Sequence, residues 1–188
     1  TWMMVLFVGL LLGGMGFFVG EYVLQADRWI VSTGSPHIYK NSNLGRGTVV
    51  DRDGVLLLDM TNGRAYSDNA QTRASTMHWL GDRNGSIQAG AVTNYAAMMA
   101  GYDKVSGLYD YNGSDGVIRL GLSAAVQNAA LEALNGRKGT VGIYNYQTGQ
   151  ILCAVTSPTY DPDNVPDVAG DTSGKYEGVY LNRFLQST

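Results

Sequence analysis

Residues 46–58 read RGTVVDRDGVLLL, two runs of β-branched and aliphatic residues on either side of the polar stretch DRDG. The pair Asp53-Gly54 between such runs is a strong hairpin signal, because glycine supplies the positive φ that a tight turn needs. We therefore predict an antiparallel β-hairpin at this point of the chain. An apolar segment lies on its N-terminal side, and a helix followed by a second hairpin lies on its C-terminal side.

The apolar segment has no charge from Trp2 to Gly20, and Glu21 is the first ionisable residue. As a helix this run would be about 28 Å long, close to the ~30 Å hydrocarbon core of a bilayer. We predict a membrane anchor at residues 1–24, followed by a polar juxtamembrane segment at 25–45. A cleaved secretory signal peptide is the alternative, although the run is longer than usual for one and no small-x-small cleavage site follows it.

Four glycines of this segment fall on one helical stripe as two G-x-x-x-G pairs, Gly9 with Gly13 and Gly16 with Gly20. Small residues on a stripe let a second helix approach closely in lipid. Glycine is also simply frequent in membrane helices. The first interpretation predicts a packing seam for a membrane partner or for a second copy, and both interpretations stay open.

The composition excludes several classes of protein. Only 15% of the 188 residues are charged, and the net charge is −3, so we do not expect nucleic acid as a partner. Cys153 is the single cysteine, which excludes a disulfide framework and any multi-cysteine metal site. His37 and His78 have no partner at ligand spacing. We therefore expect neither a metal nor a cofactor.

The second half of the chain carries the clearest helical pattern. Apolar residues recur at helical spacing over 122–135, with Ser123 as a possible N-cap and Gly136 just past the end. Two further β runs, at 140–146 and 150–156, form the second predicted hairpin.

Two other segments, 91–102 and 179–188, are expected to be helical or to begin a helix, and residues 158–178 are expected to form a loop. A β-rich first part followed by a helix and a hairpin predicts an α+β fold.

Three separated pieces of the sequence rise above chance when they are taken together. The first is RGTVVDRDG at 46–54, with Arg46, Gly47, Asp51, Arg52 and Gly54. The second is NYQTGQILCAVTSPTYDP at 145–162, with Thr148, Gly149, Ser157 and Pro158. The third is the pair Asn182-Arg183. In this order behind an apolar segment, they resemble the class B penicillin-binding proteins, which are peptidoglycan D,D-transpeptidases. HWLGD at 78–82 further resembles a Gram-positive branch of that family.

The resemblance implies a division into a transmembrane anchor at 1–24, a non-catalytic pedestal domain at 25–115 and the beginning of a transpeptidase domain at 116–188. It implies a single-pass protein of the cell membrane with most of the chain outside the cytoplasm. For the full-length parent it implies peptidoglycan stem peptides and β-lactams as ligands. It also implies a membrane glycosyltransferase as a possible partner of the anchor helix.

The departures from the family pattern concern the chemistry. The family's S-x-x-K, S-x-N and K-T-G elements are missing, because no serine has lysine three residues later and the SDN at 67–69 lies ahead of the expected nucleophile. The resemblance places S-x-x-K shortly after Thr188, so we expect no catalytic residue in this chain. Two alternatives stay open: a non-enzymatic, membrane-tethered scaffold for cell-wall synthesis partners, and an unrelated anchored α+β domain.

Overall fold

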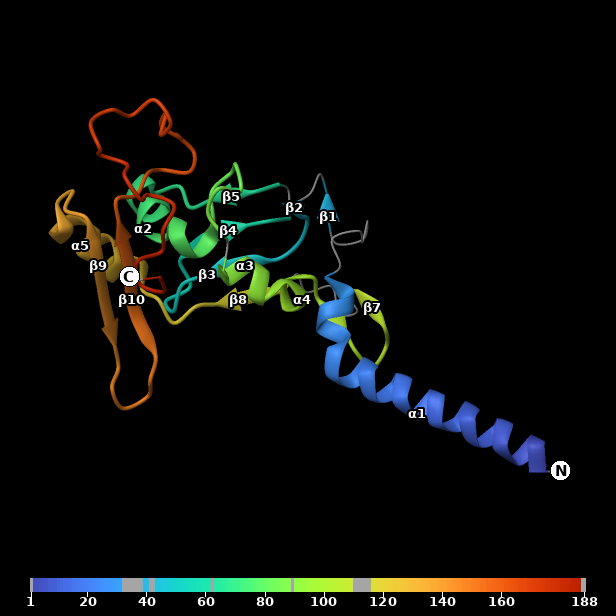
Figure 1. Ribbon diagram of the computed structural model, residues 1–188. Helices are drawn as coiled ribbons and strands as arrows, with labels where there is room; N and C mark the ends of the chain where they lie inside the picture. Colours follow the sequence, from blue (N-terminus) through green and yellow to red (C-terminus); the bar gives the residue numbers. More distant parts are fainter. Residues whose placement is uncertain are drawn as a thin grey trace.

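The computed structural model describes residues 2–31, 39–40, 43–61, 63–88, 90–109 and 116–186. It is a mixed helix and sheet structure, as the sequence predicts, with the apolar helix at one end and a long hairpin at the other (Figure 1). The helices are α1 Trp2–Ile30, α2 Ala70–Leu80, α3 Gly90–Asn94, α4 Ala96–Met99 and α5 Ala124–Leu134. The strands are β1 Tyr39–Lys40, β2 Asn43–Leu44, β3 Thr48–Val50, β4 Leu56–Asp59, β5 Ala65–Tyr66, β6 Tyr102–Asp103, β7 Leu108–Tyr109, β8 Val117–Arg119, β9 Gly139–Tyr144 and β10 Ile151–Ser157.

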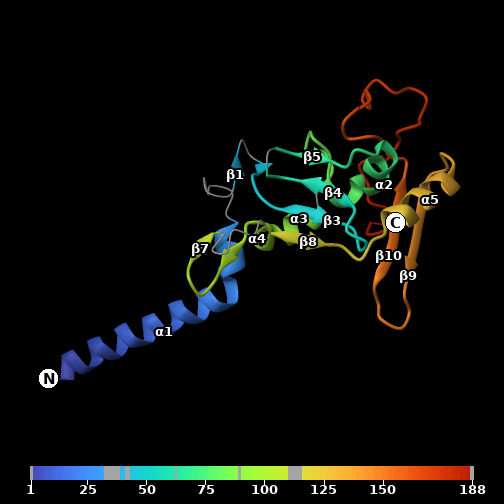
Figure 2. The same cartoon turned by 180° about the vertical axis from the view of Figure 1, so that it is seen from behind.

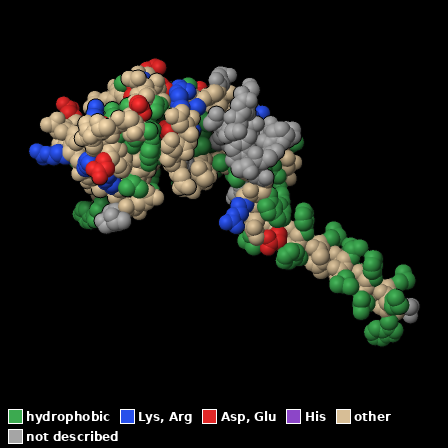
Figure 3. Space-filling model, turned by 45° about the horizontal axis from the view of Figure 1, so that its top comes forward, with side chains coloured by type: hydrophobic (Ala, Val, Ile, Leu, Met, Phe, Trp, Pro, Cys, Tyr) green, Lys and Arg blue, Asp and Glu red, His purple; other side chains and the backbone are tan. Residues whose placement is uncertain are grey.

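Helix α1 projects away from the rest of the molecule (Figures 1 and 2). Its segment Trp2–Ala26 is long and apolar enough to cross a membrane, a property that signal sequences share. The large hydrophobic side chains from Trp2 to Val19 are between 51% and 87% exposed, and Figure 3 shows them in green along the projecting part of the helix. No described part of the chain covers them, so their apolar surface needs another environment.

The C-terminal turns of α1 belong to the folded body. Ala26 and Ile30 are buried, and Ile30 lies in the main hydrophobic core. The Tyr22 hydroxyl lies 2.9 Å from the Tyr102 hydroxyl and donates to the Lys104 carbonyl at 2.9 Å. The segment from residue 25, expected to be a polar juxtamembrane stretch, is therefore helical as far as Ile30 and buries one side against the body. The remainder of that segment lies partly outside the described residues.

The predicted hairpin at Asp53-Gly54 is confirmed as strands β3 and β4, which pair antiparallel with a register shift between Val49 and Val50. They form the middle of a four-stranded sheet in the order β5-β4-β3-β8. Strand β8 joins β3 in parallel, with Val49 opposite Ile118. Val49, Leu57, Leu58 and Met60 are at most 1% exposed and form the centre of the core.

The helix expected at 91–102 is broken. Residues Gly90–Asn94 and Ala96–Met99 form two short helices, and Tyr102 already pairs with Tyr109 in the small β6-β7 ladder. Tyr95 stands between the helices with φ −110° and ψ 15°, which is not helical backbone. The break turns Met99 and Ala100 into the core, where each is at most 1% exposed.

Helix α5 and the second hairpin are confirmed at Ala124–Leu134 and at β9-β10. Two details differ from the expectation. The helix ends in Asn135, which itself takes the left-handed conformation (φ 45°) ahead of Gly136. The buried face is Ala124, Gln127 and Ala130, whereas Ala125, Ala129 and Ala133 of the expected apolar stripe are exposed. Gln127 is buried because α5 is covered on two sides, by the hairpin and by α2.

The described residues after β10, up to Gln186, form turns and bends without a helix or strand. The loop expected at 158–178 is therefore confirmed, and the helix expected from Val179 was wrong for residues 179–186. This segment is nevertheless ordered by packing, since Val179 and Tyr160 are buried with Met77 and Ile87 in a separate hydrophobic cluster.

Candidate functional site

The turn between β3 and β4 meets the start of α5 through one buried carboxylate. Asp51 is 1% exposed. Its Oδ1 accepts hydrogen bonds from the backbone N–H groups of Asp53 and Val55, both at 2.8 Å. Its Oδ2 accepts from the N–H of Ala124, the first residue of α5, at 2.9 Å. Asp51 therefore supplies the N-terminal cap of α5 from a distant part of the sequence, and its negative charge suits that end of a helix.

The backbone around this carboxylate links the first hairpin to the second. The Arg52 N–H donates to the Leu122 carbonyl at 3.0 Å, and the Ser123 N–H donates to the Leu152 carbonyl of β10 at 2.9 Å. Ser123 has the position of an N-cap but makes no side-chain cap hydrogen bond, so the expected capping role falls to Asp51 instead. The backbone of residues 120–123 is therefore hydrogen-bonded to both hairpins.

The glycines of the first motif have different surroundings. Gly47 has φ +91°, and a Cβ atom built there would lie 2.6 Å from the Met99 Cβ and 2.8 Å from the Met99 Cα. Gly54 has nearly the same φ, +89°, but no atom lies within 4 Å of a Cβ built there. Gly47 is thus required by a close approach of two backbones, and Gly54 only by the turn.

Of the two arginines of this motif, Arg52 accepts a hydrogen bond through its backbone, and Arg46 is partly buried. The Arg52 carbonyl accepts a hydrogen bond from Arg119 at 3.0 Å. The Arg46 Nη1 is buried and finds no hydrogen-bond partner among the described residues.

The second motif is divided between the two ends of the β9-β10 hairpin. Thr148 and Gly149 form the exposed turn, where Gly149 has φ +72° and donates to the Asn145 carbonyl at 2.7 Å. Ser157 and Pro158 lie at the opposite end, both buried, and the peptide bond between them is cis. These residues shape the hairpin and the exit from it.

The third motif lies beside the C-terminal end of α2. The Asn182 side chain donates to the His78 carbonyl at 3.3 Å and accepts from the Thr156 hydroxyl at 3.5 Å. Arg183 donates to the Gly178 carbonyl at 2.9 Å. The structure therefore joins Asn182 to the end of β10, and among the described residues no hydrogen bond joins either residue to the Asp51 turn.

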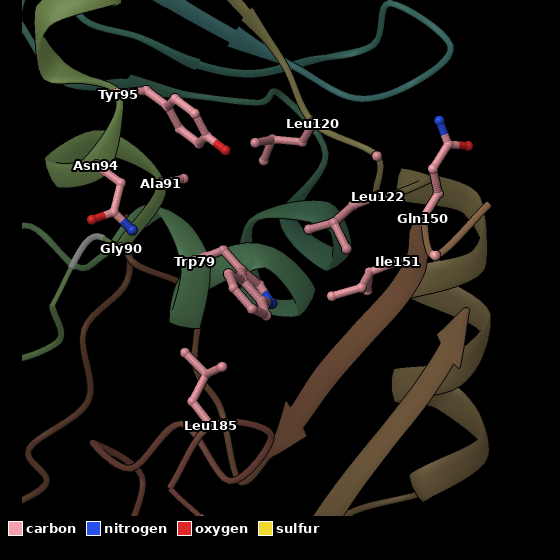
Figure 4. A pocket seen from close by; sticks show the side chains of 12 residues that line it. Trp79, Gly90, Ala91, Asn94, Tyr95, Leu120, Leu122, Gln150, Ile151 and Leu185 are labelled. Carbon is pink, nitrogen blue, oxygen red and sulfur yellow. The ribbon is translucent and has the colours of Figure 1, made fainter. Parts of the chain in front are cut away.

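A cavity of about 480 Å³ lies between these parts (Figure 4). Trp79 of α2 stands in its middle, with Leu122 and Ile151 on one side, Tyr95 and Leu120 above and Leu185 below in Figure 4. The Trp79 Nε1–H donates to the Ala154 carbonyl at 2.6 Å. Among the described residues that line the cavity, Tyr95 is the only titratable one, so this described lining suits apolar packing and provides no acid–base pair.

Cys153 and His78, the described cysteine and histidine and thus candidates for a nucleophile or a metal ligand, are both buried. Cys153 is 0% exposed and packs with Ala130 and Val155, and burial raises the pKa of its thiol, so it behaves as a small hydrophobic residue. The described residues contain no group of three or more metal-ligating side chains. His78 is buried at the end of α2, and His37 lies outside the described residues.

Sequence reasoning missed two polar residues that hold the site together. Gln127 is 0% exposed on α5, donates to the Ser75 carbonyl at 3.1 Å and accepts from the Ala154 N–H at 2.8 Å, so it ties α5 to α2 and to β10. Arg73 of α2 pairs with Asp161 in the loop after β10. A glutamine within an apolar helix was a visible signal for the first residue, but nothing local marks Arg73.

No protein-family model matches the sequence, and no curated protein matches it. Among solved structures, the chain is similar to the crystal structure of Pseudomonas aeruginosa PBP2 in complex with WCK 5153, with a TM-score of 0.40 and 25% identity. The likeness covers 63% of this chain and 28% of that chain. A TM-score below 0.5 does not by itself carry a function from one protein to the other.

Proposed function

We propose that this chain is the N-terminal portion of a class B penicillin-binding protein, a membrane-anchored peptidoglycan transpeptidase whose reactive serine follows this part of the sequence. The observation that supports the proposal most is the bond from the Ala124 N–H to the Asp51 carboxylate. It joins the first motif of the resemblance to the helix that leads into the second motif. The neighbouring Ser123 N–H donates to the carbonyl of Leu152, which lies in the second motif, so the two motifs are hydrogen-bonded to adjacent residues at the start of α5.

The division into parts is proposed on the same basis. Residues 1–24 are the anchor, residues 25–115 the pedestal and residues 116–188 the beginning of the transpeptidase domain. The hydrogen bond from the Arg52 N–H to the Leu122 carbonyl crosses from the pedestal into the second domain, and the bond from the Ser123 N–H to the Leu152 carbonyl continues within that domain. In this proposal the chain supplies the support on which the remainder of the transpeptidase domain is built, and it does not itself acylate.

Retention of the anchor is supported by how α1 ends. A cleavage after the apolar segment would remove or expose residues that the body buries, among them Ala26 at 1% and Ile30 at 8% exposure. We therefore propose a retained single-pass anchor in the cell membrane, with the bulk of the chain outside the cytoplasm.

The partners of the parent are proposed from the same resemblance. They are peptidoglycan stem peptides and β-lactams at the reactive serine, and a membrane glycosyltransferase beside α1. Gly9, Gly13, Gly16 and Gly20 have no atom within 4 Å of a Cβ built on them, so the body leaves this stripe open.

Replacing Gly13 and Gly16 together with leucine is expected to weaken helix association, because two bulky side chains would keep a second helix from the stripe. A membrane two-hybrid assay of α1 against a second copy and against a co-expressed glycosyltransferase measures this. The control is Leu11→Ala with Leu12→Ala, which changes apolar bulk without filling the stripe. An unchanged signal for the glycine variant would remove the seam from the proposal.

Labelling with a fluorescent penicillin tests the enzymatic proposal. The full-length protein expressed from the complete gene is expected to become covalently labelled, since its S-x-x-K serine attacks the β-lactam carbonyl. The chain ending at Thr188 is expected to remain unlabelled under the same conditions. A reading frame that closes without an S-x-x-K would favour the membrane-tethered scaffold, and covalent labelling of the 188-residue chain would contradict our assignment of its serines.

A further inference from the structure

The segment after β10 is held by α2. Residues 158–186 contain no described helix or strand, yet Tyr160 and Val179 are buried and pack with Met77 of α2. Figures 1 and 2 show this segment (red) returning beside α2 in both views. A segment without regular hydrogen bonding of its own takes its position from the groups that bind it. Several of those groups lie on α2 and just after its end, while Thr156 of β10 binds Asn182 and Lys138 pairs with Glu177.

The first anchor is an ion pair at the beginning of the segment. Arg73 donates to both oxygens of Asp161, with Nε at 2.7 Å from Oδ1 and Nη2 at 2.6 Å from Oδ2. The two side chains are 15% and 21% exposed. The hydrogen bonds from Arg73 hold the pKa of the Asp161 carboxyl below its usual value. This two-point geometry fixes direction as well as distance, and the Thr159 hydroxyl adds a bond to the Ala74 carbonyl at 2.6 Å.

The second anchor is at the end of the segment. The His78 Nε2 lies 2.8 Å from the Val179 carbonyl oxygen, and the Asn182 side chain donates to the His78 carbonyl at 3.3 Å. The His78 Nδ1 is buried without a partner among the described residues. A carbonyl needs a donor, so Nε2 carries the proton and Nδ1 does not. His78 therefore holds the backbone three residues before Asn182 from one side, while Asn182 holds His78 from the other.

The third anchor is a hydrogen bond between Asp82, just past α2, and Tyr160 of the segment. Asp82, which is 0% exposed just past α2, accepts a hydrogen bond from the Tyr160 hydroxyl at 3.2 Å and from the Ile87 N–H at 2.8 Å. Burial raises the pKa of the Tyr160 hydroxyl, so it remains a donor. Helix α2 also packs against β4 and α3 of the first sheet region. The anchors thus connect that region to the segment that ends at Asn182-Arg183.

We propose that Arg73, His78 and Asp82 are positioning residues. They fix the position of the segment from Thr159 to Arg183, and through it the position of the residues that follow Arg183. Resting on the proposed function, this means that α2 of the pedestal orients the residue that is to become the reactive serine. The pedestal would then control acylation through this helix, without contributing a group to the reaction.

The anchoring of this segment by α2 is tested on the 188-residue chain in detergent by hydrogen exchange. Asp161→Asn removes the carboxylate charge and half of the paired geometry, and is expected to speed amide exchange in residues 159–183 about tenfold. Exchange in β9 and β10 should not change. Asp167→Asn is the matched control in the same loop, since its described hydrogen bond is only to the Gly170 N–H. Equal exchange in the two variants would show that the Arg73–Asp161 pair does not anchor this segment.

The positioning role is tested on the full-length protein by penicillin acylation kinetics. His78→Leu is expected to lower the first-order acylation constant by about tenfold to a hundredfold, with little change in the preceding binding constant, because a misplaced nucleophile reacts slowly. His78→Gln keeps a donor for the Val179 carbonyl and is expected to restore most of the rate. Melting temperatures of both variants, measured in parallel, separate this effect from unfolding.

The outcomes distinguish this inference from the function on which it rests. If the wild-type full-length protein acylates and His78→Leu acylates at the same rate while folded, the positioning role is wrong and the transpeptidase proposal stands. If the wild-type full-length protein takes up no penicillin, the proposed function fails, and the exchange experiment alone decides whether α2 orders the segment.

Discussion

Replacing Asp51 with alanine is expected to lower the free energy of unfolding by about 3 kcal/mol or more, because it strips three backbone N–H groups of one buried acceptor. The groups are those of Asp53, Val55 and Ala124. Thermal melts in detergent, followed by near-ultraviolet circular dichroism, should show a fall of about 6–12 °C in melting temperature. The last of the three bonds also joins the two hairpin regions, so the loss should appear in both.

Two further variants make this prediction specific. Asp53→Ala removes a carboxylate from the same turn that is exposed and lies 3.4 Å from the Ser123 hydroxyl, and it should cost about 0.5 kcal/mol or less. Asp51→Asn keeps only one acceptor oxygen. If that oxygen stays with the turn, the N–H₂ group faces the Ala124 N–H, so the effect should be intermediate. A loss for Asp51→Ala no greater than that for Asp53→Ala would contradict the capping role.

Gly47→Ala is expected to destabilise the protein by about 2–5 kcal/mol. About 1–2 kcal/mol comes from placing a side chain at positive φ, and about 1–3 kcal/mol from overpacking. The added Cβ would lie 2.6–2.8 Å from the Met99 Cα, Cβ and O atoms, and Met99 is 0% exposed with no room to withdraw. The same thermal melts measure the effect.

Gly54→Ala provides the matched control for this substitution. It places alanine at φ +89° with no atom within 4 Å of the new Cβ, so it should cost only about 1 kcal/mol. The difference between the two glycine variants isolates the contact with Met99. Equal losses would mean that the close approach of Gly47 to Met99 of α4 is not present in the protein.

The local elements followed from local signals. The turn at Asp53-Gly54, the helix at 124–134 and the turn at Thr148-Gly149 were all visible in the sequence, because each depends on glycine at a positive φ or on apolar residues at helical spacing. The apolar segment was visible because length and lack of charge suffice to identify it. The residues after Val179 were misread because a short apolar run carries no information about whether a helix forms.

The contacts that make the site were not visible in this way. Asp51 and Ala124, Arg73 and Asp161, and Gln127 with Ser75 and Ala154 pair residues between 27 and 88 positions apart. A polar side chain in isolation predicts solvent as readily as a buried partner, and only the packed fold brings its partner within hydrogen-bond distance. The burial of Gln127 where a stripe of alanines was expected has the same cause, since α5 is covered by α2 and by the hairpin together.

By itself, then, the sequence determined the two hairpins, the helix at 124–134, the mixed α+β class and the order of motifs behind an apolar helix, since these depend on periodicity, glycine and charge along a short stretch of chain. Only the tertiary structure decided that Asp51 caps α5 across 73 positions and that α2 holds the segment leading to Asn182-Arg183. Those outcomes depend on which surfaces bury one another, and no local stretch of residues contains that information.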